Sequence, residues 1–554
     1  MRALDRKLLR ELGGLWGQAL AIALVIASGV ATYVMSLTTY EALRQTQQSF
    51  YQDARLAEVF AGLKRAPERL SERIAAIEGV DQVQTRVVAQ VNLEIADYAD
   101  PVSGLLVSVP DTGQPTLNRL YLRRGGLPEP GRDDQVVLNE LFADAHGLGP
   151  GDRLSAVING HRQQLIVVGV ALSPEHVFVI QPGALFPDNR SFGVLWMART
   201  PLATAYDMQG AFNDLSLTRF AGTETADIIE RLDALLEPYG GLGAYDRELQ
   251  LSHRYLESEL EGLRAMAAVF PVIFLGVATF LLNVVISRLI SLQREQIAAL
   301  KAFGYHNHEI GLHYLKLVGL IVLVGVALGI GAGAWLGHGM SELYMTFYRF
   351  PFLEYRLRPG VAVSAALISA AAGVLGTLHA VRRAVSMPPA EAMQPEPPAR
   401  YRVTLIERTG LQRLLSQPAR MILRNLERRP LKAGFTVLGI SMGCAILVVG
   451  LFQEDAVNYM VDVQFRFAQR DDLTVSLTGP TARPALHEIV ALPGVSYAEP
   501  FRSVAVRLSH EQHEYRTGIQ GLPAESRLQR LLDTELRVLR LPPSGLVLTD
   551  YLAR

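Results

Sequence analysis

Five long apolar stretches constrain the fold of this chain more than any other feature. The hydrocarbon core of a bilayer is about 30 Å thick, so a spanning helix needs roughly 20 mostly apolar residues. Stretches that meet this requirement, with charges only at their ends, cover residues 15–37, 265–290, 312–337, 361–381 and 433–452. The sequence therefore predicts an α-helical polytopic membrane protein, and a hydrophobic content of 49% over 554 residues agrees with it.

The first stretch has a second interpretation, as a signal peptide. Arg2, Arg6, Lys7 and Arg10 precede it, as basic residues precede the apolar part of a signal peptide. Its apolar part is about twice the usual length, however, and no clear A-x-A cleavage site follows it. An uncleaved membrane anchor is therefore favoured.

The distribution of lysine and arginine predicts the orientation, because short basic loops stay in the cytoplasm. Basic residues are concentrated in residues 1–14, a juxtamembrane helix, in the loop 291–311 and in the linker 382–432. These three regions are expected to be cytoplasmic, together with the N-terminus. The regions expected outside are 38–262, the short loop 338–360 and 453–554, although the short loop carries Arg349, Arg356 and Arg358.

Composition disfavours several classes of function. The chain has 53 basic and 54 acidic residues, a formal net charge of −1, so nothing points to a nucleic-acid partner. The single cysteine, Cys444, excludes an intrachain disulfide and a cysteine-rich metal site. His146, His161 and His176 are isolated in the sequence and are interpreted as surface or packing residues. We predict neither catalytic nor metal-binding residues in this chain.

The region between the first two spans reads as an inserted α+β extracytoplasmic domain. Short apolar runs bounded by turn residues, at 105–110 and 163–170, predict strands. Apolar residues at helical spacing predict helices over 56–77 and 226–236.

Short motifs of this domain recur near the end of the chain and predict a tandem repeat of the whole module. In the first copy the motifs are residues 74–80, 85–91 and 136–143; in the second they are 487–495, 501–506 and 546–553. After residue 143 the first copy continues into further strands and three spans, whereas the sequence stops at Arg554. We expect that the second module is incomplete here; the alternative is a natural short outer tail.

Two segments carry a resemblance to a known family. Residues 291–310 read S-L-Q-R-E-Q-I-A-A-L-K-A-F-G-Y-H-N-H-E-I, and residues 380–393 read A-V-R-R-A-V-S-M-P-P-A-E-A-M. They resemble the loop helix and the basic exit of the FtsX/MacB-like ABC transporter permeases, with Met393 where leucine is usual. Residues 423–440 are similar to that family's start motif. The resemblance implies a MacB-like domain over 38–262 and a bacterial inner-membrane location.

The resemblance also implies a partner, a dimer of a cytoplasmic ABC ATPase. The chain has no G-x-x-x-x-G-K-[ST] motif, so it holds no cofactor of its own and ATP would be bound by the partner. A short amphipathic helix could fit a groove of that ATPase; the alternative is a helix that lies on lipid headgroups. The residues expected to couple the two proteins are Arg294, Glu295, Ile297, Leu300, Lys301 and Gly304.

By resemblance, such a permease exports or extrudes lipid, lipoprotein, peptide or drug by mechanotransmission, with or without a periplasmic adaptor protein. A non-transporting sensor or scaffold is the alternative. The third span carries glycines at every fourth residue, which predict close helix packing: Gly325, Gly329, Gly333 and Gly337. The expected partner is the fourth span, where Ala365, Ser369, Gly373 and Thr377 have the same spacing.

Overall fold

The structure is a computed structural model that describes residues 3–96, 98–182, 184, 186–386, 388, 416–418, 422, 430–477, 481–510 and 513–553. The chain divides into two compact units, Met1–Gly443 and Cys444–Arg554, and each is described by itself. Most of the predicted linker 382–432, with Met393, and the first part of the 423–440 motif lie outside the described residues.

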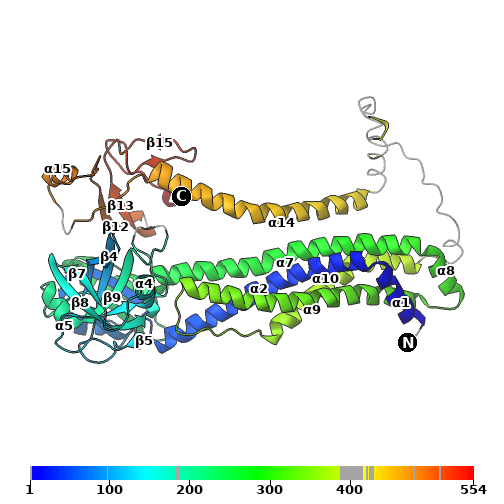
Figure 1. Ribbon diagram of the computed structural model, residues 1–554, viewed down its shortest axis with the longest axis horizontal. Coiled ribbons are helices and arrows are strands. Elements are labelled where there is room, and N and C mark those ends of the chain that lie inside the picture. The colour runs from blue at the N-terminus through cyan, green and yellow to red at the C-terminus, as the bar shows by residue number, and fades with distance from the viewer. Residues whose placement is uncertain are drawn as a thin grey trace. The chain divides into compact units, whose positions relative to one another are not determined.

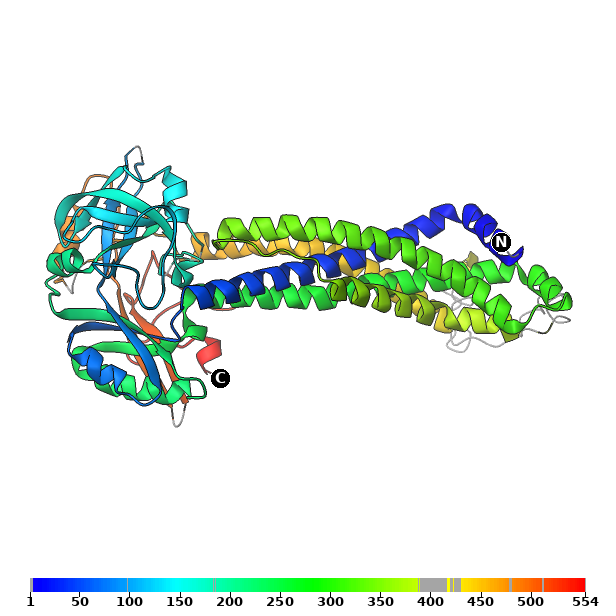
Figure 2. The same ribbon diagram turned by 90° about the horizontal axis from the view of Figure 1, so that it is seen from below.

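Long helices dominate the first unit. They are α2 (Trp16–Asp53), α7 (Leu251–Leu292), α9 (Asn307–Phe347) and α10 (Pro359–Ser386), with short α1 (Ala3–Gly14) before them and α8 (Arg294–Ala302) between α7 and α9. The four long helices lie side by side (Figures 1 and 2). Together with α14 (Pro430–Asp462), they are the five helices of the described chain that are long and apolar enough to cross a membrane.

Three of these helices are much longer than a bilayer is thick. With 38, 42 and 41 residues for α2, α7 and α9, a rise of 1.5 Å per residue makes them roughly 57–63 Å long. In α2 the apolar sequence stops near residue 37, but helix-forming residues continue the helix to Asp53. The bundle therefore continues beyond the apolar part as a stalk.

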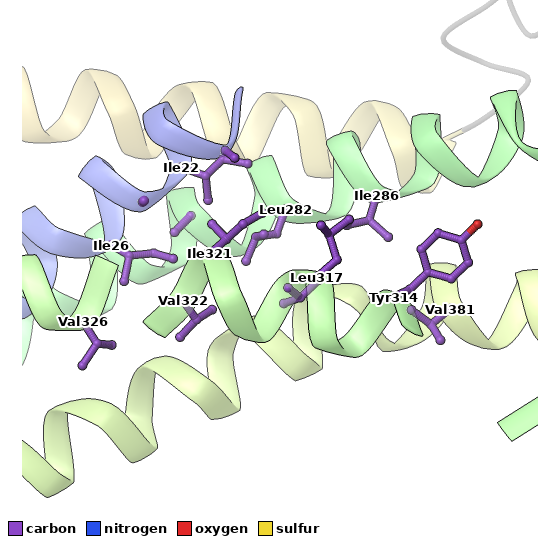
Figure 3. Packing of buried hydrophobic residues seen from close by; sticks show 14 of the residues in the cluster. Ile22, Ile26, Leu282, Ile286, Tyr314, Leu317, Ile321, Val322, Val326 and Val381 are labelled. Carbon is purple, nitrogen blue, oxygen red and sulfur yellow. The ribbon is translucent and has the colours of Figure 1, made fainter. Parts of the chain in front are cut away.

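The bundle is held together by aliphatic side chains from all four long helices. Figure 3 shows this packing, with residues from α2, α7, α9 and α10 directed into one interior. The labelled residues are Ile22, Ile26, Leu282, Ile286, Tyr314, Leu317, Ile321, Val322, Val326 and Val381, all buried. This core connects the helices on both sides of α8 with the first span.

The outer domain, residues 54–250, is inserted between α2 and α7 and contains two sheets. The four-stranded sheet has the order β11-β1-β10-β2 and is antiparallel. Its strands are β1 (Val59–Pro67), β2 (Val80–Arg86), β10 (Ala211–Arg219) and β11 (Gly241–Asp246). Helices α3 (Leu70–Ala75) and α6 (Thr225–Leu236) complete its core.

The seven-stranded sheet has the order β5-β8-β6-β9-β4-β3-β7 and is mixed, with β4–β9 and β6–β8 parallel. The long strand β8 (His161–Leu172) also pairs with β7, so the sheet closes on itself. The other strands are β3 (Val88–Glu94), β4 (Val102–Val109), β5 (Tyr121–Gly125), β6 (Gln135–Asn139), β7 (Arg153–Ile158) and β9 (Phe192–Ala198). Helices α4 (Glu140–His146) and α5 (Arg199–Ala205) contribute side chains to the core of this sheet.

One helix predicted in this domain is wrong. Residues 56–77 were expected to be helical, but Val59–Pro67 form strand β1 and only Leu70–Ala75 are α-helical. The backbone of β1 pairs with β10 on one side and with β11 on the other. This tertiary pairing overrides the short helical pattern of the apolar residues at the start of β1. The strands expected at 105–110 and 163–170 and the helix at 226–236 are confirmed.

The second unit contains the C-terminal part of α14, helix α15 (Pro484–Val490) and a hairpin of β12 (Arg502–His510) with β13 (His513–Gly521). Short α3 and α15 are each followed by a left-handed glycine, Gly79 at φ 94° and Gly494 at φ 90°. This local geometry is common to both copies of the motif, and the tandem repeat as a whole stays a prediction.

Candidate functional site

Helix α8 lies at the end of the bundle opposite the outer domain (Figures 1 and 2). It begins directly after α7, and its last turn is followed by Gly304 at φ 91°, a conformation that favours glycine. The amide of Tyr305 donates to the carbonyl of Leu300 at 3.1 Å, which closes the helix end. The turn at Gly304 thus brings the chain back to α9 at Asn307.

One face of α8 is packed against the bundle. Ile297, 4% exposed, and Ala298 are buried, and Leu300 packs partly against the same core. The ammonium of Lys301 donates to the backbone carbonyl of Val385 in α10 at 2.8 Å. Three of the predicted coupling residues therefore hold α8 to the bundle instead of presenting a free surface.

The opposite face of α8 is exposed, and large apolar side chains flank the helix at both ends. Leu292, the last residue of α7, and Phe303, which directly follows α8, are 75% and 84% exposed, and Glu295 between them in sequence is exposed as well. Of the predicted set, Glu295 and Gly304 lie on this side and Arg294 is half-buried. Sequence reasoning missed Leu292 and Phe303, although apolar residues beside a charged turn are a signal for a contact surface.

A buried polar network ties α1 to α8 and α9. The carboxylate of Glu11 accepts hydrogen bonds from Nε2 of His313 at 2.9 Å and from the Gln293 amide at 2.7 Å, and it pairs with Lys7. The hydroxyl of Tyr314 donates to the Gln293 side-chain oxygen at 2.9 Å. Burial raises the pKa of Glu11, but hydrogen bonds from His313 and Lys7 outweigh this effect, and the net pKa is lowered. Glu11 is therefore ionised at neutral pH.

The glycines of α9 pack against α2, and the expectation that they face α10 is wrong. A Cβ atom on Gly329 would lie 2.6 Å from Val30 Cβ, and one on Gly333 would lie 2.7 Å from Val34 Cβ. Gly325 and Gly337 likewise face α2. Branched side chains of α2 recur every fourth residue and fill the groove above the glycines. In α10, Gly373 packs against Val318 and Val322 of α9, so the two small-residue stripes do not meet.

At the other end of the stalk, an aromatic cluster joins the helices to the outer domain. This junction cluster contains Phe50 and Tyr51 of α2, Leu256 and Leu260 of α7, Phe178 and Ile180 of the outer domain, and Tyr348 and Phe350 after α9. Arg123 of β5 donates to the carbonyls of Phe350 and Pro351 at 2.9 and 2.8 Å and pairs with Glu140 at 3.0 Å. The domain is thus attached to three helices at once.

A buried ion triad crosses from one sheet of the outer domain to the other. Arg86 of β2 binds Glu175, which follows β8, through two bonds of 2.6 and 2.9 Å, and binds Asp214 of β10 at 2.8 Å. The carbonyl of Glu175 accepts from Gln250, whose side chain caps α7. Burial raises the pKa of Asp214 to about 6, with Arg86 opposing. Burial alone would raise the pKa of Glu175, but the charge and hydrogen bonds of Arg86 lower this pKa by a larger amount. The net pKa of Glu175 is therefore lowered.

Comparison with known families identifies the region around α8. Residues 268–389, from within α7 to just beyond α10, match the family described as FtsX-like permease C-terminal. This segment is similar to the C-terminal part of FtsX-like permeases. The family expected from the 291–310 and 380–393 motifs is therefore confirmed, and α8 lies inside the matched permease segment. No curated protein sequence matches the chain.

Three solved structures are similar to parts of this chain. The extracellular domain of the noncanonic ABC-type transporter YknZ from Gram-positive bacteria is 12% identical, with a TM-score of 0.23, over 33% of this chain and 97% of that one. The periplasmic region of MacB from Actinobacillus actinomycetemcomitans is 10% identical, with a TM-score of 0.24, over 38% and 95%. A domain of a proposed permease from Porphyromonas gingivalis is 13% identical, with a TM-score of 0.23, over 35% and 90%.

Proposed function

We propose that this chain is the permease subunit of an ABC-type system and that a separate cytoplasmic ATPase dimer drives it by mechanotransmission. The observation that carries the proposal is the continuity of α2, α7 and α9. These helices run from the exposed turn at α8 to the junction cluster beneath the outer domain. A displacement applied at one end can therefore reach the other without a channel between them.

The ATPase would contact the exposed face of α8 at Glu295, together with Leu292 and Phe303 at the two ends of the helix. Because Ile297 is buried in the bundle and Lys301 binds α10, a movement of α8 would move α7, α9 and α10 with it. The close approach of α9 to α2 at Gly329 would pass the movement to the first span. The Glu11 network gives a second connection, between α1 and both sides of α8.

At the outer end, the junction cluster would convert helix movement into movement of the outer domain. The proposed setting is a bacterial inner membrane with the N-terminus in the cytoplasm. The proposed work is export or extrusion of lipid, lipoprotein, peptide or drug, with a periplasmic adaptor where the system needs one.

Copurification tests this proposal. Phe303→Asp and Glu295→Lys should each abolish association with the cognate ATPase and stimulation of its ATP hydrolysis, while the membrane level of the chain is unchanged. Phe220→Asp is the matched control, because Phe220 is 56% exposed on the outer domain. Retained copurification of both α8 variants would refute docking at this face.

A second measurement separates export from sensing. Deletion of the gene should change export of at least one substrate of the classes named above. If export of every tested compound is unchanged and a periplasmic partner loses its regulation, the chain is a sensor or scaffold instead.

A further inference from the structure

A groove lies between the start of α9 and the end of α10, beside the coupling turn, defined as residues 293–306, which contain α8. It has a volume of about 600 Å³ and is open to the surroundings. Its floor is apolar, formed by Gly311, Leu312 and Leu315 of α9 and Val381 and Val385 of α10. Because Leu312 and Leu315 lie in the first turns of the predicted span 312–337, this floor lies at the edge of the expected hydrocarbon region.

A second hollow of about 340 Å³ continues the groove past the ends of the helices. The two share Asn307, Val385 and Ser386 in their walls, so they form one continuous surface. The second hollow is polar, with Lys301 and His306 in its wall, and Arg382 and His308 line the adjoining part of the groove. The combined groove thus has an apolar end and a basic end.

The charge in this groove has one sign. No acidic residue is among the described residues that line either hollow. The carboxylate nearest in sequence is that of Glu309. It accepts a hydrogen bond from the backbone amide of His306 at 2.9 Å and so caps the start of α9. The amino-terminal end of α9, which carries the positive end of the helix dipole, opens onto the same place.

We infer that this groove binds an anionic phospholipid, with an acyl chain on the Leu312–Leu315 side and the phosphate near Lys301, His308 and Arg382. Basic pockets between spans on the cytoplasmic side are suited to anionic headgroups. An apolar floor next to a basic rim fits an amphipathic anion better than free phosphate, which would leave the floor without a partner. The lipid would lie against Lys301 and thus against the last turn of α8. The inference rests on the membrane placement in the proposed function, and it does not require the ATPase.

Lipid binding is measurable on the full chain purified in detergent. Phosphatidylglycerol should raise the midpoint of thermal unfolding and appear as a bound species in native mass spectrometry, whereas phosphatidylcholine with the same acyl chains should do so far less. Arg382→Gln should weaken the phosphatidylglycerol affinity about fivefold, the effect of one basic residue at an anionic surface. Gly311→Leu should abolish binding by filling the floor, since a Cβ there already lies 3.4 Å from Val385 Cγ2.

Arg383→Gln is the control, because Arg383 is the next residue, is exposed and has the same charge but does not line the groove. Equal binding of both lipids, or equal loss in the Arg382 and Arg383 variants, would overturn the inference. So would an equal shift with inorganic phosphate alone, or binding that appears only when residues 389–429 are deleted, which would show that the chain's own linker occupies the groove. Failure of ATPase docking with lipid selectivity intact would remove the proposed coupling and leave this site in place.

Discussion

The carboxylate of Glu11 accepts a hydrogen bond from Nε2 of His313 at 2.9 Å, although 302 residues separate the two in sequence. The same carboxylate accepts a bond from Gln293, at the junction of α7 and α8. The N-terminal helix is thereby fastened to both ends of the coupling turn.

We expect Glu11→Ala to destabilise the protein by about 1–3 kcal/mol, because the Gln293 and His313 donors then lose a buried acceptor. Thermal unfolding in detergent measures the loss. Glu342→Gln is the control, since Glu342 is exposed and its contact with His338 is on the surface. Equal melting of the two variants would show that the Glu11 network contributes nothing to stability.

Substitution of Arg86 should be far more damaging than substitution of Asp214. Arg86→Leu leaves two buried carboxylates without their counter-charge, and the expected loss of unfolding free energy is about 3–5 kcal/mol. Asp214→Asn leaves Arg86 paired with Glu175 and should cost much less. Denaturant unfolding of the full chain, followed by a probe on the outer domain, compares the two; a smaller loss for Arg86→Leu would contradict the assignment.

The triad also predicts a pH dependence. The pKa of Asp214 rises from its ordinary value of 3.8 to about 6 in the folded protein, so between these values the folded state binds more protons than the unfolded state. The contribution of Asp214 to stability must therefore fall as pH rises from about 4 to 6. Asp214→Asn should flatten that part of the profile of unfolding free energy against pH. An unchanged slope would show that Asp214 does not titrate in this range.

The packing of α9 on α2 can be tested with two glycines of one helix. Gly329→Leu forces a side chain into Val30 and should cost about 1–3 kcal/mol through overpacking. Gly331→Leu should cost little, since no atom lies within 4 Å of a Cβ at that position. Thermal unfolding of both variants decides, and equal losses would refute the packing of this stripe against α2.

The attachment of the outer domain should depend on Arg123 and not on its neighbour. Arg123→Gln removes the bonds to the Phe350 and Pro351 carbonyls, so hydrogen exchange of the segment 348–352 should accelerate. Arg124→Gln is the control, because Arg124 pairs with exposed Asp144, which keeps its contact with Arg349 in that variant. Unchanged exchange in the Arg123 variant would mean that other contacts hold the segment, such as the bond from the Arg349 amide to the Val177 carbonyl at 3.0 Å.

Orientation is open to thiol labelling, because Cys444 is the single native cysteine. In a Cys444→Ser background, Thr112→Cys lies at an exposed position of the outer domain and should react with an impermeant reagent on intact spheroplasts. Gln394→Cys should react only after the membrane is permeabilised. The reverse pattern would invert the proposed topology and separate α8 from any cytoplasmic ATPase.

Much of the bundle could be predicted from hydropathy, while the extent of its helices could not. The apolar stretch 15–37 locates a helix, but hydropathy stops where the chain becomes polar, and α2 continues to Asp53. Strand β1 was missed for a related reason. Its short apolar pattern fits two periods, and only pairing with β10 and β11 selects the strand.

The candidate site shows the same division. The 291–310 motif located the coupling turn, but it could not say which face of α8 is free. Ile297 and Lys301 face inward because the bundle and Val385 of α10 receive them, and Phe303 is left exposed.

The sequence by itself determined that this protein has apolar spans, an inserted outer domain and an FtsX-like turn, because a run of about 20 apolar residues has few stable solutions in a bilayer. Only the tertiary structure decided which helix covers the glycines of α9, which face of α8 is exposed and that Glu11 joins α1 to His313. Those outcomes depend on the shape and polarity that distant segments present to one another, which no local pattern records.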